Sequence, residues 1–270
     1  MVSVQVAAWH DRQQRYIHYS TGVFRQLLDC LARPGKLNRL EDPIFLDDLP
    51  TYYSARRQAQ VPFNRYALGA LMTLLDGEVS FTLAADGHWL SESDAAVYWL
   101  ALRTGSHSAA ASEATFALFC DGKSGGLLRE LSLGTLLEPE LSATAIYCVE
   151  RLADEREQLS GPEVISCALR GPGIPDLRRL QISGLEAHEL ELIKATRGVQ
   201  QSSIQEQSSE PLALEIGQDN EQARTLSADE ASDKKESDSS GDFALGVDVY
   251  LIDATGLCVG LPRTTRLVKG

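Results

Sequence analysis

Two arginines and two threonines near the C-terminus form a dense group of side chains that can bind anions. They lie in the run Leu261-Pro262-Arg263-Thr264-Thr265-Arg266. Guanidinium and hydroxyl groups bind phosphate or phosphonate oxygens well. In a regular strand Arg263 and Thr265 share one face, and Thr264 and Arg266 share the other. The four side chains therefore cannot all bind one ligand from a regular strand. The alternative interpretation is a solvated strand edge without a ligand.

Arg25 is a further candidate, because it lies off the apolar face of an expected helix that Leu28 and Leu31 help to define. This position favours a surface or interface arginine. Arg25, Arg263 and Thr264 are therefore our candidate ligand-binding residues. No residue is assigned a catalytic role.

Other signatures of chemistry do not occur in the sequence. It has no GxSxG, GxxxxGK[ST], GxGxxG or HExxH motif. The five histidines are scattered without metal-ligand spacing, so no metal site is predicted. The paired carboxylates Asp47-Asp48 and Glu138 with Glu140 are typical of solvated loops.

Five cysteines occur without any CxxC spacing, at Cys30, Cys120, Cys148, Cys167 and Cys258. Several lie inside apolar runs, which favours free thiols used as small core residues in a reducing compartment. Met1 to Trp9 does not resemble a signal peptide, and no apolar run approaches the ~18 residues of a membrane span. We expect a cytoplasmic protein that does not enter a membrane.

The chain has 270 residues and a net charge of −13. The length allows one large domain or two small ones. The acidic balance argues against nucleic-acid binding, which needs a basic surface to meet the phosphates. It leaves room for a small phosphorylated ligand bound by a local arginine cluster.

The elements that must position these residues alternate between helices and strands. Hydrophobic periodicity and caps predict helices at 20–31, 64–76, 91–103, 126–131 and 185–196. Alternating or apolar runs predict strands at 79–84, 114–119, 143–149, 164–169, 247–252, 257–261 and 265–268. The mixture predicts an α/β fold, with a mixed central sheet flanked by helices.

The segment 199–242 differs from the rest in composition. It contains eleven acidic and three basic residues and no aromatic residue. Such a segment cannot bury enough apolar surface to offset its ordering entropy. We expect one domain made of 1–198 and 243–270, with 199–242 as an acidic, disordered insertion loop. A partner-binding segment that folds on contact is the alternative.

Five motifs, in this order along the chain, resemble the PhnH family of phosphonate metabolism proteins. They are the helix and turn from Phe24 to Gly35, Ala114-Thr115-Phe116, Leu133-Gly134-Thr135 with Pro139-Glu140 and Ala143-Thr144, Leu169-Arg170-Gly171-Pro172-Gly173-Ile174, and Leu245-Gly246-Val247-Asp248 with the later Leu261 to Thr265. Two departures are Ala244, where the family has a proline, and the insertion 199–242.

The resemblance implies a fold similar to the large domain of pyridoxal-phosphate-dependent transferases, without the cofactor. None of the six lysines follows a strand as an aldimine lysine would. We therefore predict that the chain uses no cofactor.

The resemblance also implies a function. Members of the family join G, I and J subunits in the core complex of carbon–phosphorus lyase, and an isolated homodimer is expected. The complex supports displacement of adenine from ATP by a phosphonate, which gives ribose 1-phosphonate 5-triphosphate. We expect a structural or accessory role here. The alternatives are a stand-alone small-molecule enzyme or cofactor binder, and a ligand-sensing module.

Overall fold

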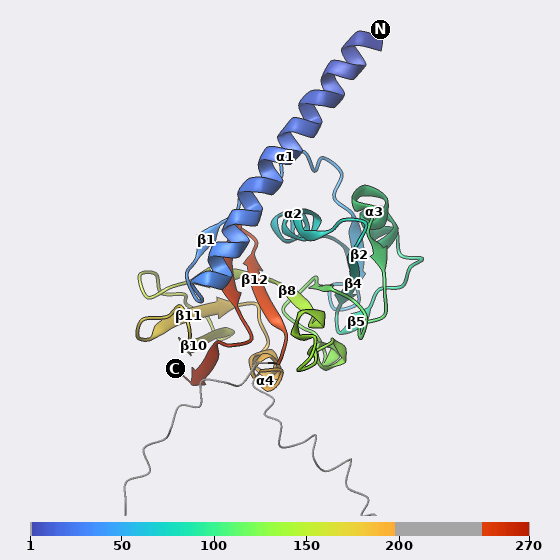
Figure 1. Cartoon of the computed structure of the whole chain (residues 1–270). Coiled ribbons are helices and arrows are strands. Elements are labelled where there is room, and N and C mark those ends of the chain that lie inside the picture. Colours follow the sequence, from blue (N-terminus) through green and yellow to red (C-terminus); the bar gives the residue numbers. More distant parts are fainter. Residues whose placement is uncertain (1, 198–244, 270) are drawn as a thin grey trace, which may run out of the picture. The chain divides into compact units, whose positions relative to one another are not determined.

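The computed structural model describes residues 2–197 and 245–269, with side-chain surroundings for 13–197 and 245–268. The chain divides into two units, Met1–Val199 with Ala244–Gly270, and Gln200–Phe243. The second unit lies outside the described residues, so the disordered insertion predicted for 199–242 stays a prediction. The first unit contains every described helix and strand (Figure 1).

A mixed sheet of eight strands forms the centre of the first unit, in the order β1-β13-β12-β8-β7-β4-β5, with β6 beside β4. The strands β12, β8, β7, β4 and β6 run parallel, while β13, β1 and β5 pair antiparallel to their neighbours. This confirms the predicted mixed sheet, in which the predicted strands 247–252 and 257–261 pair as a hairpin. The bounds are β1 Asn38–Arg39, β4 Ser80–Ala85, β5 His88–Trp89, β6 His107–Ser108, β7 Phe116–Phe119, β8 Thr144–Val149, β12 Asp248–Asp253 and β13 Leu257–Leu261.

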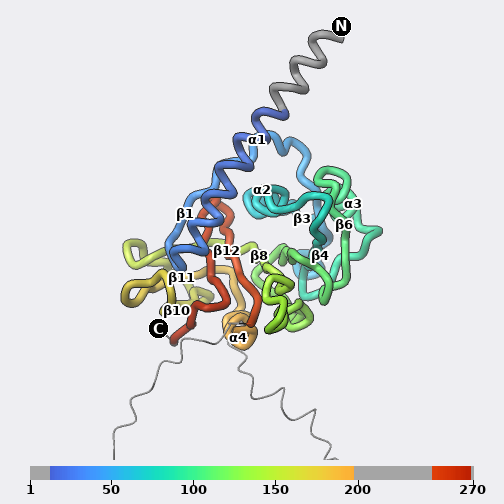
Figure 2. Tube along the Cα trace, in the orientation of Figure 1, coloured from blue at the N-terminus to red at the C-terminus, as the bar shows by residue number. Residues whose placement is uncertain are grey.

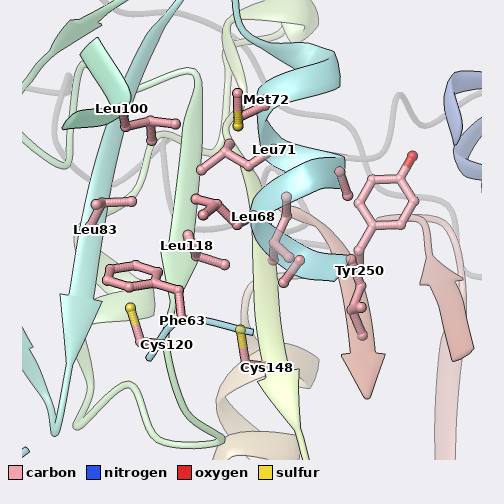
Figure 3. Close-up of a cluster of buried hydrophobic side chains, with 14 of the residues drawn as sticks. Phe63, Leu68, Leu71, Met72, Leu83, Leu100, Leu118, Cys120, Cys148 and Tyr250 are labelled. Atoms are coloured by element: carbon pink, nitrogen blue, oxygen red, sulfur yellow. The ribbon is translucent and has the colours of Figure 1, made fainter. Parts of the chain in front are cut away.

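Three helices contribute to the core on one face of this sheet. Leu27, Leu71 and Leu100, one from each helix, belong to the same buried cluster as Ile146 and Tyr250 of the sheet. Figure 3 shows Leu71, Leu100 and Tyr250 in this cluster. Burial of this apolar face stabilises the unit. The helices are α1 Val2–Ala32, α2 Arg65–Leu74 and α3 Ala95–Thr104.

A second, four-stranded sheet and a fourth helix pack on the other face. Leu180 and Leu192 join Tyr147, Val249 and Val259 of the main sheet in a separate buried cluster. The sheet has the order β14-β10-β11-β9, and a two-stranded hairpin β2-β3 lies apart from it. The remaining bounds are β2 Thr51–Ser54, β3 Ala59–Pro62, η1 Leu127–Glu130, η2 Pro139–Leu141, β9 Arg151–Ala153, β10 Val164–Arg170, β11 Arg178–Ser183, α4 Ala187–Ala195 and β14 Arg266–Lys269.

Local capping explains why α2 begins where the sequence predicts. Asn64 Oδ1 accepts hydrogen bonds from the backbone N–H of Tyr66 at 2.9 Å and of Ala67 at 3.2 Å. The helix α3 ends at Gly105, whose φ of 74° is the left-handed conformation that favours glycine. Both helices confirm the sequence prediction.

The prediction for α1 was wrong at its start. A helix that begins at residue 20, with Ser20 or Thr21 as its cap, follows from the sequence pattern, but the helix begins at Val2. The Ser20 hydroxyl donates to the carbonyl of Ile17, so it lies on the helix surface and caps nothing. Leu28 was also expected on the buried face and is 51% exposed.

All five cysteines are free and buried, which confirms the prediction from sequence. Figure 3 shows Cys120 and Cys148 within the cluster beneath α2. No helix among the described residues is both long enough and apolar enough to cross a membrane.

Candidate functional site

The turn after β13 holds Arg263 in a network of polar contacts. Its backbone N–H donates to Asp248 Oδ1 at 2.7 Å, and its Nη2 donates to Asp248 Oδ2 at 3.1 Å. Its Nη1 donates to the carbonyl of Pro139 at 2.8 Å. Asp248 opens β12 and Pro139 precedes β8, so Arg263 ties together the amino ends of two parallel neighbours. We call Leu261–Arg266 the arginine turn.

A second guanidinium group, from Arg197, reaches the same turn. Its Nη1 donates to the carbonyl of Thr265 at 3.0 Å, and its Nη2 donates to the carbonyl of Leu261 at 2.8 Å. Burial lowers the pKa of Arg197 to about 10, and the negative charge of Asp248 opposes that shift. Arg197 was absent from the sequence prediction.

The arginine turn carries more positive than negative charge, because Arg197 and Arg263 share the single carboxylate of Asp248. Two buried polar atoms there, Arg197 Nε and Thr265 Oγ1, have no hydrogen-bond partner within the described residues. Donors of this kind are the groups to which an anionic oxygen can bind.

Further motif segments meet at the arginine turn. A Cβ on Gly171 would lie 2.9 Å from the carbonyl oxygen of Thr264, and one on Gly173 would lie 2.5 Å from that of Ala32. Both glycines have positive φ, at 141° and 79°. The hydrogen bond from Ile174 N–H to the carbonyl of Gly171, at 3.1 Å, closes a tight turn here. Segments far apart in sequence therefore converge on one place.

The three predicted ligand residues lie in three different environments in the structure. Arg263 is largely buried in the arginine turn, while Thr264 in the same turn is exposed. Thr265 is buried and Arg266 is exposed, as the predicted alternation required. Arg25 is exposed on α1, and within the described residues no hydrogen bond or ion pair joins it to the turn. A ligand role for Arg25, Arg263 and Thr264 stays a prediction.

An apolar stripe lies on the outer surface of α1. Ile17, Phe24 and Leu28 are 54%, 44% and 51% exposed. They are spaced seven and four residues apart, so they share one side of the helix. Arg25 is exposed beside them. We call Ile17, Phe24 and Leu28 the α1 stripe.

The opposite ends of the parallel strands carry a carboxyl pair. Asp86 follows β4 and Asp121 follows β7, and the backbone N–H of Asp86 donates to Asp121 Oδ2 at 3.1 Å. Burial, together with the charge of Asp86, raises the pKa of Asp121 to about 6. Burial of Asp86 is outweighed by hydrogen bonds from Ser54 and from two backbone N–H groups, which lower its pKa. Asp121, with its raised pKa, can therefore gain or lose a proton near neutral pH beside the ionised carboxylate of Asp86.

This pair was missing from the sequence prediction. The carboxylates considered there, Asp47-Asp48 and Glu138 with Glu140, are exposed, as expected. A usable signal existed, because Asp86 and Asp121 each closely follow a predicted strand. The carboxyl ends of parallel strands meet at one edge of a sheet.

The buried carboxylate of Glu189 fixes the loop that follows Asp121. It accepts hydrogen bonds from Ser124 N–H at 2.8 Å, Ser124 Oγ at 2.6 Å and Tyr147 Oη at 3.0 Å. The N–H of Gly125 adds a contact at 3.3 Å. A buried charge held by several donors rigidifies its surroundings. Glu189 therefore joins α4 to the carboxyl edge of the sheet.

Comparison with known proteins accounts for the converging motifs. The model of the family described as bacterial phosphonate metabolism protein (PhnH) matches residues 12–201. The chain belongs to the PhnH family. A similar protein of Rhizobium meliloti (strain 1021), the alpha-D-ribose 1-methylphosphonate 5-triphosphate synthase subunit PhnH, is 30% identical over 178 residues. The aligned part covers 66% of this chain and 76% of that protein.

The PhnH match includes α1 from residue 12, the carboxyl pair and Arg197. The arginine turn lies beyond the matched residues, but it is bound to them through Arg197 and Pro139. The stretch that resembles the family therefore depends structurally on the C-terminal strands.

Proposed function

We propose that this chain is an accessory, non-catalytic subunit of a PhnH-type complex with G, I and J partners. The complex would support displacement of adenine from ATP by a phosphonate, giving ribose 1-phosphonate 5-triphosphate. The Rhizobium meliloti relative is a subunit of a synthase for alpha-D-ribose 1-methylphosphonate 5-triphosphate, which supports this assignment.

One observation carries the proposal of a docking role. Phe24, Arg25 and Leu28 belong to the motif that resembles the family's opening helix, yet all three are exposed. Packing within this chain explains the buried motif residue Leu27, but it does not explain the exposed ones. Exposed apolar side chains gathered on one helix face are typical of protein interfaces.

The arginine turn fits an accessory role because its strongest contacts are internal. Arg263 donates hydrogen bonds to Asp248 and to the carbonyl of Pro139, and Arg197 donates to two backbone carbonyls. These groups stabilise the ends of strands and support the subunit's shape. The proposal further includes a cytoplasmic location, a homodimer when the chain is isolated, a fold related to pyridoxal-phosphate transferases and no bound cofactor.

Co-expression with the G, I and J counterparts tests docking directly. The wild-type chain is expected to co-purify with them, and the mass of the assembly gives the stoichiometry. Leu28→Glu should reduce recovery of the complex at least tenfold, because it places a charge in an apolar contact. Leu102→Glu is the control, since Leu102 is also an exposed leucine on a helix, α3, at 73% against 51% for Leu28.

Two outcomes would count against docking through the α1 stripe. One is equal recovery of the Leu28→Glu and wild-type complexes. The other is failure of the wild-type chain to bind any of the three partners, which would also remove the proposed function.

A second candidate function is anion sensing at the arginine turn, because two guanidinium groups there share one carboxylate. Calorimetry of the purified chain with ATP or methylphosphonate should then release heat that Arg263→Ala abolishes. No heat from the wild-type chain would leave the turn with a structural role alone.

A further inference from the structure

Two buried thiols face each other where the end of α1 meets the sheet. Cys30 Sγ lies 3.8 Å from Cys258 Sγ and 3.6 Å from the carbonyl oxygen of Cys258. Both residues are fully buried. They belong to α1 and β13, which lie side by side although they come from opposite ends of the sequence (Figure 2).

The backbone brings these thiols together for a definite reason. Cys258 and Gly260 are two apart on β13, so they share the face turned toward α1. A Cβ on Gly260 would lie 2.7 Å from the backbone carbonyl atoms of Cys30. The N–H of Gly35 donates to the carbonyl of Gly260 at 3.3 Å. Glycine at this position therefore allows the end of α1 to approach the strand closely enough for the thiols to meet.

Polar groups around Cys30 distinguish it from the other buried thiols. Asn38, which pairs with Cys258 across β1 and β13, donates its Nδ2 to Cys30 Sγ at 3.3 Å. The same amide group donates to Asp29 Oδ2 at 2.8 Å. Hydrogen bonding with Cys258 and Asn38 lowers the pKa of the Cys30 thiol although burial opposes this, whereas burial raises the pKa of Cys258. Cys30 is therefore the better nucleophile of the pair.

We propose that Cys30 and Cys258 form a modification site, a dithiol that closes to a disulfide when the chain meets a peroxide. The sulfur atoms must approach from 3.8 Å to about 2.05 Å, which side-chain rotation with a small shift of α1 can supply.

The chemistry balances with hydrogen peroxide as the two-electron oxidant. The Cys30 thiolate attacks one peroxide oxygen, a sulfur–oxygen bond forms, the oxygen–oxygen bond breaks, and hydroxide leaves and takes up a proton. The Cys258 thiolate then attacks the Cys30 sulfur, and hydroxide leaves from that sulfur as water. Two thiols and one peroxide become one disulfide and two waters. The bond would link the end of α1 covalently to β13.

The test uses the reduced, full-length chain treated with hydrogen peroxide, with and without urea below the unfolding transition. Alkylation in denaturant followed by non-reducing peptide mapping counts and locates the thiols. We expect three free thiols, a cross-linked pair of peptides containing Cys30 and Cys258, reversal by dithiothreitol and a rise in Tm of about 5 °C. Cys30→Ser and Cys258→Ser should each keep all four remaining thiols free.

Cys167→Ser is the control, because Cys167 belongs to a different buried cluster. It should still form the bond. Five free thiols under both conditions would overturn the proposal. A cross-link that maps to Cys120 and Cys148 would overturn it as well.

Discussion

The two ends of the parallel strands differ in the charges that they bring together: opposite charges at the amino ends and like charges at the carboxyl ends. At the amino ends, Asp248 lies between Arg263 and Arg197, and every one of these groups fixes backbone or another charge. At the carboxyl ends, Asp86 and Asp121 place like charges side by side. Opposite charges in contact compensate each other when they are buried, whereas paired carboxyls repel each other to a degree that varies with pH. At the amino ends of the strands, which we call the amino edge, the charges hold the backbone in place. At the carboxyl ends, the carboxyl edge, the charge of the pair changes with pH.

Asp248→Ala should produce the largest loss of stability. Within the described residues, Asp248 is the carboxylate that Arg263 and Arg197 share, so its removal leaves two partly buried positive charges together. We expect a loss of about 3 kcal/mol in the free energy of unfolding. Urea denaturation measures this. Asp47→Ala, in an exposed loop, should change the same quantity little, and equal effects of the two variants would contradict the account of the amino edge.

Arg263→Ala should have the next largest effect. It removes two side-chain hydrogen bonds, to Asp248 and to the carbonyl of Pro139, but the backbone bond to Asp248 Oδ1 remains. A loss of about 2 kcal/mol is expected. Thermal unfolding checks it, with Arg266→Ala in the same turn as the exposed control. An unchanged Tm would show that Arg263 does not tie the strands together.

Asp121→Asn should stabilise the protein at high pH. The folded pKa of about 6 is higher than the unfolded value of 3.8, so ionisation favours the unfolded chain. The stability contributed by the protonated carboxyl is complete below pH 3.8 and is lost as pH rises through 6. Discounting for partial exposure, we expect a gain of about 1 kcal/mol at pH 8 that vanishes near pH 4. Urea denaturation at both pH values measures it, and a gain independent of pH would contradict the raised pKa.

Lys123→Ala should have the smallest effect, although it lies at the carboxyl edge. Its ion pair with Glu186 spans 3.2 Å, but both side chains are more than 40% exposed. Solvent screening limits such pairs, so a change below about 0.5 kcal/mol is expected by thermal unfolding. A larger loss would mean that the lysine also offsets the charge of the carboxyl pair.

The sequence predicted the elements whose signals are local. The start of the helix near Asn64 and the two strands at 247–252 and 257–261 follow from neighbouring residues, and both were confirmed. The four-residue strands β2 and β3 were missed because their side chains alternate over too short a span. The bounds of α1 failed because its apolar face becomes regular only in its C-terminal half.

The candidate site was harder to predict, because its contacts join distant residues. Arg263 was chosen from its motif, but its partner Asp248 was not singled out as one. Arg197 binds Leu261 across 64 positions, and nothing in its neighbourhood indicates this. Asp86 and Asp121 come together only when β4 pairs with β7. Sequence patterns give the faces of elements, and strand order decides which charges meet.

The position of β12 between β8 and β13 has a consequence for synthesis. Thr144 of β8 pairs with Asp248 of β12, so the ribosome must translate residues 198–244 before this strand gains its neighbour. Until then β8 exposes an unpaired, strongly apolar border, the kind of surface that aggregates or recruits chaperones. A nascent chain halted before Asp248 should therefore be held by chaperones, and completion of the two closing strands should release it.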